Sequence, residues 1–324
     1  MGAAGRRDGL HIVARDRVEP VGDRGAMKTS SVLINNYNNG RYLAACIDSV
    51  LAQTRPADEI IVYDDGSTDD SLEILRGYGH RIVLIEGVHN PDRSRVHNHA
   101  DAVFRAFERS SGEWLFLLDG DDAFVPHKIE RTLRAVEGQS GVALVQAPMR
   151  LINGRGEEIG GYRDPRFHCR DVRAEIYRQN DVDFFYPTSA LVVHRTELAQ
   201  VLPLDMSYCT ALACDTRIGM LMPLLGRVIT LDEHLTFWRR HAGSFSGKRG
   251  RRRWNQVRQT LRRVRTFNIA SAKYAAPPIS LWKNRRFRRQ IVGALLPGKL
   301  RLRLQGVKTR SVPEPLAPSA LPRA

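Results

Sequence analysis

Three aspartates follow directly after an apolar run, in the words WLFLL at residues 114–118 and DGDD at 119–122. Their carboxylates would repel one another by roughly several tenths of a kcal/mol or more if nothing neutralised them. A divalent cation is the simplest partner, and crowded carboxylate oxygens suit Mg²⁺ or Mn²⁺. The spacing therefore predicts a metal site at Asp119, Asp121 and Asp122, where a bound ion would bridge a diphosphate.

A second acidic pair, Asp64 and Asp65, ends another apolar run and opens the loop DDGSTDD at residues 64–70. One carboxylate in such a place can accept a hydrogen bond from the N3–H of a uracil or from ribose hydroxyls, as acids at strand ends do in nucleotide-binding sheets. Loops of this composition are also common turns and helix caps. The sequence leaves both interpretations open, nucleotide contact and loop structure.

The elements that must position these acids are short strands, each followed by a polar loop and a helical pattern. Runs typical of buried strands stand at residues 31–34, 59–63, 81–85 and 113–118, and apolar residues at helical spacing follow them. Units this short, repeated in this order, predict a parallel sheet with right-handed crossovers. Such sheets bind ligands beyond the carboxyl ends of their strands, which is where the acids stand.

Five words in the sequence form an ordered set. They are SVLINNYN (31–38), IDSVLAQT (47–54), EIIVYDDGSTD (59–69), SGEWLFLLDGDD (111–122) and FWRRHAGSFS (237–246). In this order they resemble glycosyltransferase family 2. The resemblance implies the A-type glycosyltransferase fold, an α/β architecture with a Rossmann-like, mostly parallel sheet flanked by helices. It also implies an inverting, hexosyl-type enzyme that moves a sugar from a nucleotide-diphosphate sugar to a hydroxyl group.

The same resemblance sets the expected domain boundaries. The catalytic domain is expected at residues 27–247, with a nucleotide-sugar-binding half at 27–125 and an acceptor-binding half at 126–247. Residues 1–26 mix charges with glycine without a sustained period, and we expect them to be a disordered leader or the product of an over-called start codon.

Residue by residue, the resemblance implies three sets of site residues. Tyr37 is implied as the ring that packs on the base, and Asp65 as the acid that recognises it. The nucleotide-binding set is Asn35, Tyr37, Asn38, Asp64, Asp65, Asp119 and Gly120. The metal set is Asp119, Asp121 and His241, with Asp121 as the direct ligand and a packed loop as the alternative role of His241. Phosphate or acceptor contacts are assigned to Asp122, Arg239 and Arg240.

An acid near the start of a later helix serves as general base in the family, and Asp215 in the word ACDTRIGM (213–220) occupies that place. Asp205 and Asp183 are the alternatives. The implied mechanism is an in-line displacement, in which Asp215 accepts the proton of the acceptor hydroxyl while that oxygen attacks the anomeric carbon. The metal would assist departure of the diphosphate.

Some positions depart from the family pattern. Asn35 stands where a proline is usual, His97 precedes Asn98 where an arginine is common, and Cys214 stands where a glutamate is common. The second change lies near the donor, so the identity of the sugar cannot be carried over. His97 and His99 show no zinc-binding spacing, and we assign them structural roles.

The net charge of +15 is a property of one end of the chain. Residues 248–324 carry 21 of the 50 Lys and Arg residues and a single acid, Glu314, whereas residues 1–247 carry the other 34 acids. A slightly acidic body with a basic appendage favours an enzyme docked on an anionic surface over a protein that grips a duplex. The sequence shows no zinc pattern, helix-turn-helix or aromatic sheet signature, so we expect no specific nucleic-acid partner.

Residues 248–310 are expected to form a basic amphipathic helical extension, followed by a Pro-rich disordered tail at 311–324. Apolar residues recur there at three- and four-residue steps with arginines between them, at Trp254, Val257, Leu261, Val264 and Phe267. Such helices lie in the interface of anionic bilayers, so we predict peripheral binding to the inner face of the plasma membrane. The alternative is a helix packed on the acidic body of the enzyme itself.

No apolar run approaches the ~18–20 residues that span a bilayer, and the N-terminus lacks a signal-peptide core. The cysteines at positions 46, 169, 209 and 214 form no C-x-x-C pair and are expected to be reduced thiols. With the resemblance, this predicts a cytoplasmic enzyme of cell-envelope polysaccharide synthesis, with a UDP-linked sugar donor and a saccharide or lipid-linked acceptor. A catalytically inactive family member that binds sugar nucleotides as a subunit is the alternative.

Overall fold

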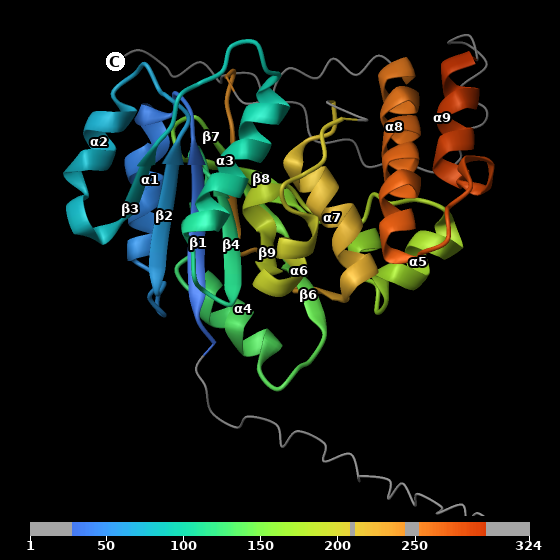
Figure 1. Ribbon diagram of the computed structural model, residues 1–324, viewed down its shortest axis with the longest axis horizontal. Helices are drawn as coiled ribbons and strands as arrows, with labels where there is room; N and C mark the ends of the chain where they lie inside the picture. Colours follow the sequence, from blue (N-terminus) through green and yellow to red (C-terminus); the bar gives the residue numbers. More distant parts are fainter. Residues whose placement is uncertain (1–27, 208–210, 244–252, 296–324) are drawn as a thin grey trace, which may run out of the picture.

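The computed structural model describes residues 28–207, 211–243 and 253–295 (Figure 1). The predicted leader at 1–26, the predicted tail at 311–324 and parts of the extension therefore lie outside the described residues, as do Cys209 and residues 244–247. Within the described residues no helix combines the length and apolarity that crossing a membrane would need. Cys46, Cys169 and Cys214 carry free thiols.

The main sheet has seven strands in the order β10-β6-β9-β4-β1-β2-β3. Its strands are β1 (Ser30–Asn36), β2 (Glu59–Asp64), β3 (Val83–Glu86), β4 (Trp114–Asp119), β6 (Val142–Gln146), β9 (Leu191–His194) and β10 (Arg227–Thr230). β9 runs antiparallel to both of its neighbours, and the other strand pairs of this sheet are parallel. The prediction of a mostly parallel sheet is therefore confirmed.

Helices cover both faces of this sheet because successive strand residues point to opposite sides. On one side Val32 and Ile34 share a core with helices α1 (Gly40–Leu51), α2 (Ser71–Gly77) and α4 (Lys128–Val136). On the other side Leu33 shares a core with α3 (Arg95–Arg109), α5 (Val172–Gln179), α6 (Arg195–Val201) and α7 (Cys214–Leu225). Short 3₁₀ turns stand at Gly79–Arg81, Pro165–Phe167, Thr188–Ala190, Ala272–Tyr274 and Leu281–Lys283.

Strand register decides which polar residues meet at the edge of the sheet. The parallel pairing of β1 with β4 sets Asn35 opposite Asp119, and its pairing with β2 sets Asn36 opposite Asp64. The polar residues that end these three strands therefore meet at one edge, as the carboxyl ends of parallel strands must.

A smaller second sheet brings a distant segment of the chain back to that edge. It consists of β5 (Ala123–Phe124), β11 (Thr236–Arg240), β7 (Met149–Asn153) and β8 (Glu158–Tyr162), in that order. β5 follows directly after Asp122, and its antiparallel pairing with β11 places Phe237 opposite Ala123. The segment from Arg239 to His241 consequently lies beside the acidic cluster.

The C-terminal extension packs on the catalytic domain through α8 (Arg253–Ser271), with α9 (Arg285–Leu295) alongside (Figure 1). Val264 and Phe267 are buried in the same core as α5 and α7. Trp254 and Leu261, in contrast, are 49% and 40% exposed. The apolar residues predicted to form one face of a helix therefore divide between the core and the surface.

Candidate active site

A pocket of about 180 Å³ opens at the carboxyl ends of β1, β2 and β4, and residues in the first turns of α3 and α7 also line it. Its lining includes a large part of the predicted site, namely Asn35, Tyr37, Asp65, Asp119, Asp121 and Asp215. The strand register and the two helix N-termini thus bring together residues from 35 to 215.

One wall of the pocket carries the residues implied in base recognition. The ring of Tyr37 stacks on the imidazole of His89, with centroids 4.0 Å apart. His89 Nδ1 lies 2.6 Å from Asp65 Oδ2, and Asn98 Nδ2 lies 3.2 Å from the same ring nitrogen. Burial raises the pKa of Asp65, although the hydrogen bond with His89 acts in the opposite direction. The wall is a flat aromatic surface bordered by a carboxylate.

Asp64 and Asn38 have different surroundings from Asp65, because the side chains of both form hydrogen bonds with residues of the loop after β2. The buried Asp64 carboxylate accepts hydrogen bonds from Asn36 Nδ2 at 2.6 Å and from the backbone N–H and hydroxyl of Ser67, each at 2.8 Å. Asn38, at φ 53°, accepts from the Thr68 N–H through its side chain. Of the paired acids, only Asp65 lines the pocket.

Asp119 ends β4 at the centre of the pocket. Its Oδ1 accepts a hydrogen bond from Asn35 Nδ2 at 2.6 Å and lies 3.2 Å from His99 Nε2. Burial alone would raise the pKa of Asp119, but the contact with His99 and the Asn35 hydrogen bond outweigh it and lower that pKa. The next residue is Gly120, where an added Cβ would stand 2.7 Å from Asn36 Oδ1, so only glycine fits without displacing that side chain.

Asp121 and Asp122 differ in accessibility. Asp121 Oδ2 lies 3.0 Å from His241 Nε2, so the predicted metal-site histidine does reach the cluster. Asp122 is buried, and its two oxygens accept hydrogen bonds from the Ser189 hydroxyl at 2.5 Å and the Arg239 N–H at 2.8 Å. Burial, followed by the charges of the other two aspartates, raises the pKa of Asp122 well above its usual range.

The acidic cluster fits a divalent cation. Asp119, Asp121 and Asp122 each offer a carboxylate oxygen, and these atoms lie within 4.8 Å of one another. Hard oxygen donors at this spacing suit Mg²⁺ or Mn²⁺. Since both oxygens of Asp122 already accept hydrogen bonds, Asp119 and Asp121 are the residues best able to hold the ion, with the His241 ring beside Asp121.

The two arginines of β11 are engaged in packing and backbone contacts. Arg239 Nε donates to the Asp121 carbonyl at 2.8 Å, and its guanidinium lies 4.7 Å from the centroid of the Tyr42 ring. Arg240 lies 4.8 Å from the centroid of the Trp238 ring. Neither arginine lines the pocket, whereas Trp238 does.

Asp215 stands in the first turn of α7 and lines the same pocket as Tyr37. Its Oδ1 accepts a hydrogen bond from the Thr216 N–H at 2.5 Å. Burial raises the pKa of Asp215, with the charge of His99 acting in the opposite direction and that of Asp119 adding to the rise. A half-buried carboxylate with a raised pKa beside the acidic cluster can accept a proton from a bound hydroxyl group.

Sequence reasoning missed several pocket residues, notably His89, Arg95, His99 and Trp238. The structural role expected for His99 stays a prediction; in the structure its ring lines the pocket and lies 3.2 Å from Asp119. A signal for His89 exists in the sequence, because it follows the third predicted strand at the edge where ligands bind. His99 gives no such signal, since its role depends on how α3 lies across the sheet.

Comparison with known proteins identifies the family. Residues 31–193 match the family profile described as Glycosyl transferase family 2. The chain belongs to glycosyl transferase family 2. Among its relatives, an uncharacterized glycosyltransferase of Nostoc sp. is 31% identical over 232 residues, which cover 66% of this chain and 65% of the relative. The glycosyltransferase GlyG of Streptococcus pneumoniae is 23% identical over 218 residues, covering 66% of this chain and 71% of GlyG.

Solved structures share the fold of this family 2 member at low identity. A fragment of TarS from S. aureus in complex with UDP-GlcNAc superposes with a TM-score of 0.55 at 15% identity, covering 87% of this chain and 76% of the fragment. The mannosyltransferase PcManGT from Pyrobaculum calidifontis, in complex with GDP-Man and Mn2+, gives a TM-score of 0.52 at 16% identity, with coverage of 86% and 79%. The expected A-type glycosyltransferase fold is thereby confirmed. The chain spans about two thirds of the length of its Nostoc relative.

Proposed function

We propose that this protein transfers a sugar from a nucleotide-diphosphate sugar to a hydroxyl group of a saccharide or lipid-linked acceptor, with inversion at the anomeric carbon. The observation that carries the proposal is the common pocket of Asp65, Asp119 and Asp215. It combines an aromatic wall bordered by an acid, a cluster of hard oxygen donors and a carboxylate with a raised pKa. In that order, these groups would bind a nucleobase, hold a metal ion beside a diphosphate and accept the proton of a hydroxyl group.

Donor binding uses two parts of the pocket, the aromatic wall at Tyr37 and the acidic cluster that follows β4. The nucleobase stacks at Tyr37 and donates a hydrogen bond to Asp65, as carboxylates at strand ends accept from nucleotides. Asp119 and Asp121 would hold Mg²⁺ or Mn²⁺, and such an ion would neutralise charge on the diphosphate. The contact of Asn35 and His99 with Asp119 fixes that carboxylate in place.

Proton transfer belongs to Asp215. Its carboxylate takes the proton from the acceptor hydroxyl as that oxygen forms the bond to the anomeric carbon, while the bond from this carbon to the diphosphate oxygen breaks. The electron pair of the broken bond leaves with the nucleoside diphosphate. Of the alternative bases, Asp183 is paired with Arg263, and Asp205 is exposed and does not line the pocket.

The full-length protein should be screened against UDP-sugars and GDP-sugars with Mn²⁺ or Mg²⁺. A donor present at about 100 times its Kd stabilises the fold by about 2.7 kcal/mol, which a thermal-shift assay detects. We expect one class of nucleotide sugar to bind and to release its nucleoside diphosphate slowly by hydrolysis. Binding without any hydrolysis or transfer would favour the inactive, sugar-nucleotide-binding subunit. Failure of every donor to bind would overturn the proposal.

A further inference from the structure

Helix α8 presents two stripes of different character. The inner stripe is buried and consists of Val257, Thr260, Val264, Phe267 and Ala270. The outer stripe is exposed and consists of Trp254, Arg258, Leu261, Arg262, Arg265 and Ile269. Residues three or four apart in a helix share a face, so the outer stripe is a continuous strip of apolar and basic side chains. We refer to it below as the α8 strip.

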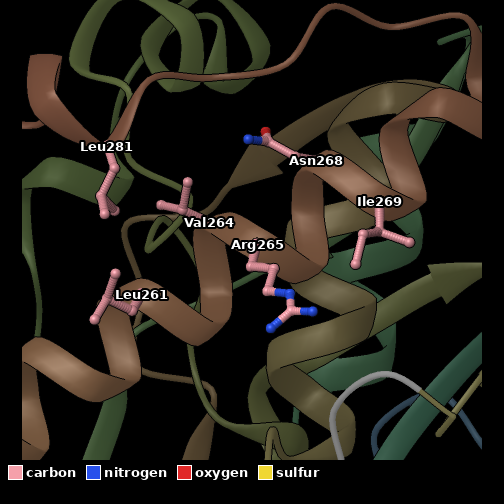
Figure 2. Close-up of a pocket in the computed structure, with 6 residues that line it drawn as sticks. All are labelled: Leu261, Val264, Arg265, Asn268, Ile269 and Leu281. Atoms are coloured by element: carbon pink, nitrogen blue, oxygen red, sulfur yellow. The ribbon is translucent and has the colours of Figure 1, made fainter.

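An open apolar groove of about 550 Å³ runs along the α8 strip. In Figure 2 the side chains of Leu261, Val264 and Leu281 converge, and the guanidinium of Arg265 extends away from them. Ile269, which is 41% exposed, extends the groove toward the C-terminal end of α8. Exposed apolar side chains that gather on one helix face are a feature of interaction surfaces.

The charge of this surface is uniformly positive. The sequence from 253 to 295 contains no Asp or Glu. Arg263 and Arg286 form ion pairs with Asp183, which attach the extension to the catalytic domain. Within the part of the chain that the structure describes, Arg258, Arg262 and Arg265 form no ion pair with a carboxylate. The arginines of the α8 strip therefore present their charge to whatever covers the groove.

We propose that the α8 strip and its groove bind the surface of an anionic lipid bilayer. Phosphate groups of the lipids pair with Arg258, Arg262 and Arg265, while Trp254 and Leu261 enter the boundary between headgroups and acyl chains. Tryptophan is enriched at this boundary because its ring is apolar and its N–H is polar. A nucleic-acid duplex would use the arginines and leave the aliphatic side chains in water, so the mixed composition favours a bilayer.

The experiment is flotation of the full-length protein with vesicles, because deleting the extension would remove Val264 and Phe267 from the core of the catalytic domain. Vesicles containing phosphatidylglycerol should carry the protein upward at low salt and release it at high salt. Vesicles of pure phosphatidylcholine should carry much less. Equal binding to both kinds of vesicle, or no binding to the anionic one, overturns the proposal.

Point variants locate the binding surface. Each near-surface arginine contributes about fivefold to the partition coefficient, so changing Arg258, Arg262 and Arg265 together to Gln should weaken binding roughly 100-fold. Leu261→Glu should also weaken it. The matched control is Ile159→Glu, on β8 of the catalytic domain, where Ile159 is 51% exposed. If the control loses as much binding as Leu261→Glu, or if the triple variant binds like wild type, the α8 strip is not the membrane-binding surface.

Tryptophan fluorescence provides a second readout. The chain has four tryptophans, and Trp254 and Trp282 are the exposed ones among the described residues, at 49% and 71%. Entry of Trp254 into the bilayer boundary should shift its emission to shorter wavelength on addition of anionic vesicles. The shift should disappear in Trp254→Phe and persist in Trp282→Phe. A shift that survives Trp254→Phe and is lost in Trp282→Phe contradicts the proposal, because it places the contact elsewhere.

Discussion

The phenol ring of Tyr37 lies nearly parallel to the imidazole of His89, with 11° between the two ring planes. Asp65 holds His89 in this position through the contact between its Oδ2 and the ring Nδ1. The stacked pair gives this wall of the pocket a flat surface whose orientation depends on a loop after β3. In the donor binding that we propose, the base would stack on this pair or take the place of the His89 ring.

Nucleotide affinity should depend on the Tyr37 ring rather than on its hydroxyl. We expect Tyr37→Phe to bind UDP like wild type and Tyr37→Ala to bind it about tenfold more weakly, since stacking contributes about 0.5–1.5 kcal/mol beyond the buried area. Isothermal titration calorimetry with UDP and Mn²⁺ measures both. Unchanged affinity in Tyr37→Ala would remove Tyr37 from the base site.

Transfer should require the carboxylate of Asp121. Asp121→Ala should fold normally and lose activity by about 100-fold or more, because a metal stabilises the leaving diphosphate by several kcal/mol. A chelator should abolish wild-type activity, and Mn²⁺ or Mg²⁺ should restore it. Asp232→Ala, at a carboxylate that is 80% exposed, is the surface control and should keep full activity. Full turnover of Asp121→Ala, or of wild type in chelator, contradicts the metal site.

The positions of these acids follow from local pattern, which explains why the sequence predicted them. An apolar strand that ends in Asp119, or in Asp64 and Asp65, must place its last residues at one edge of a parallel sheet. The place of these acids at the edge of the sheet therefore requires no knowledge of distant contacts. The neighbour of Asp119 does require it, because the pairing of β1 with β4 that sets Asn35 opposite Asp119 joins segments far apart in the sequence.

The rest of the site depends on contacts between segments far apart in the sequence. The packing behind Asp122 is an example: the Ser189 hydroxyl donates to Asp122, and the buried Lys128 donates hydrogen bonds to the Ser189 carbonyl and the Thr236 hydroxyl, which no local pattern predicts. The sequence likewise does not predict that β9 is an antiparallel strand or that it pairs with β4. For α8 the spacing predicted a helix, but only the packed structure shows that Phe267 is buried while Trp254 is exposed.

Asp215 should control the acid side of the pH profile. A general base must be deprotonated, so kcat should fall as pH drops through the pKa of Asp215. Because burial raises this pKa, we expect the acidic limb at a higher pH than for an exposed aspartate. Asp215→Asn should bind donor within a few-fold of wild type, lose transfer by roughly 10²–10⁴ and leave no such limb in the residual rate. If the limb persists in Asp215→Asn, another group is the base.

The ion pairs of Asp183 should stabilise the docked extension in a pH-dependent manner. Asp183 Oδ1 lies 2.8 Å from Arg263 Nη1, and Arg286 contacts the other carboxylate oxygen. Burial would raise the pKa of Asp183, but the charges of the two guanidinium groups outweigh it and hold that pKa well below its usual range. A depressed folded-state pKa means that the stabilisation is complete above the unfolded pKa of about 3.9 and is lost as pH falls toward the folded value.

Asp183→Asn should accordingly lower the free energy of unfolding by about 3 kcal/mol at pH 7, since it leaves a largely buried Arg263 without its counter-charge. Urea denaturation measures the difference, which should narrow as pH falls from about 5 toward about 3. Asp232→Asn is the matched control: its partner Arg163 lies at the surface, and such exposed pairs contribute less than about 1 kcal/mol. An Asp183→Asn protein with wild-type stability would contradict the stabilising role of these ion pairs, and loss of transfer in such a protein would return Asp183 to the candidates for the general base.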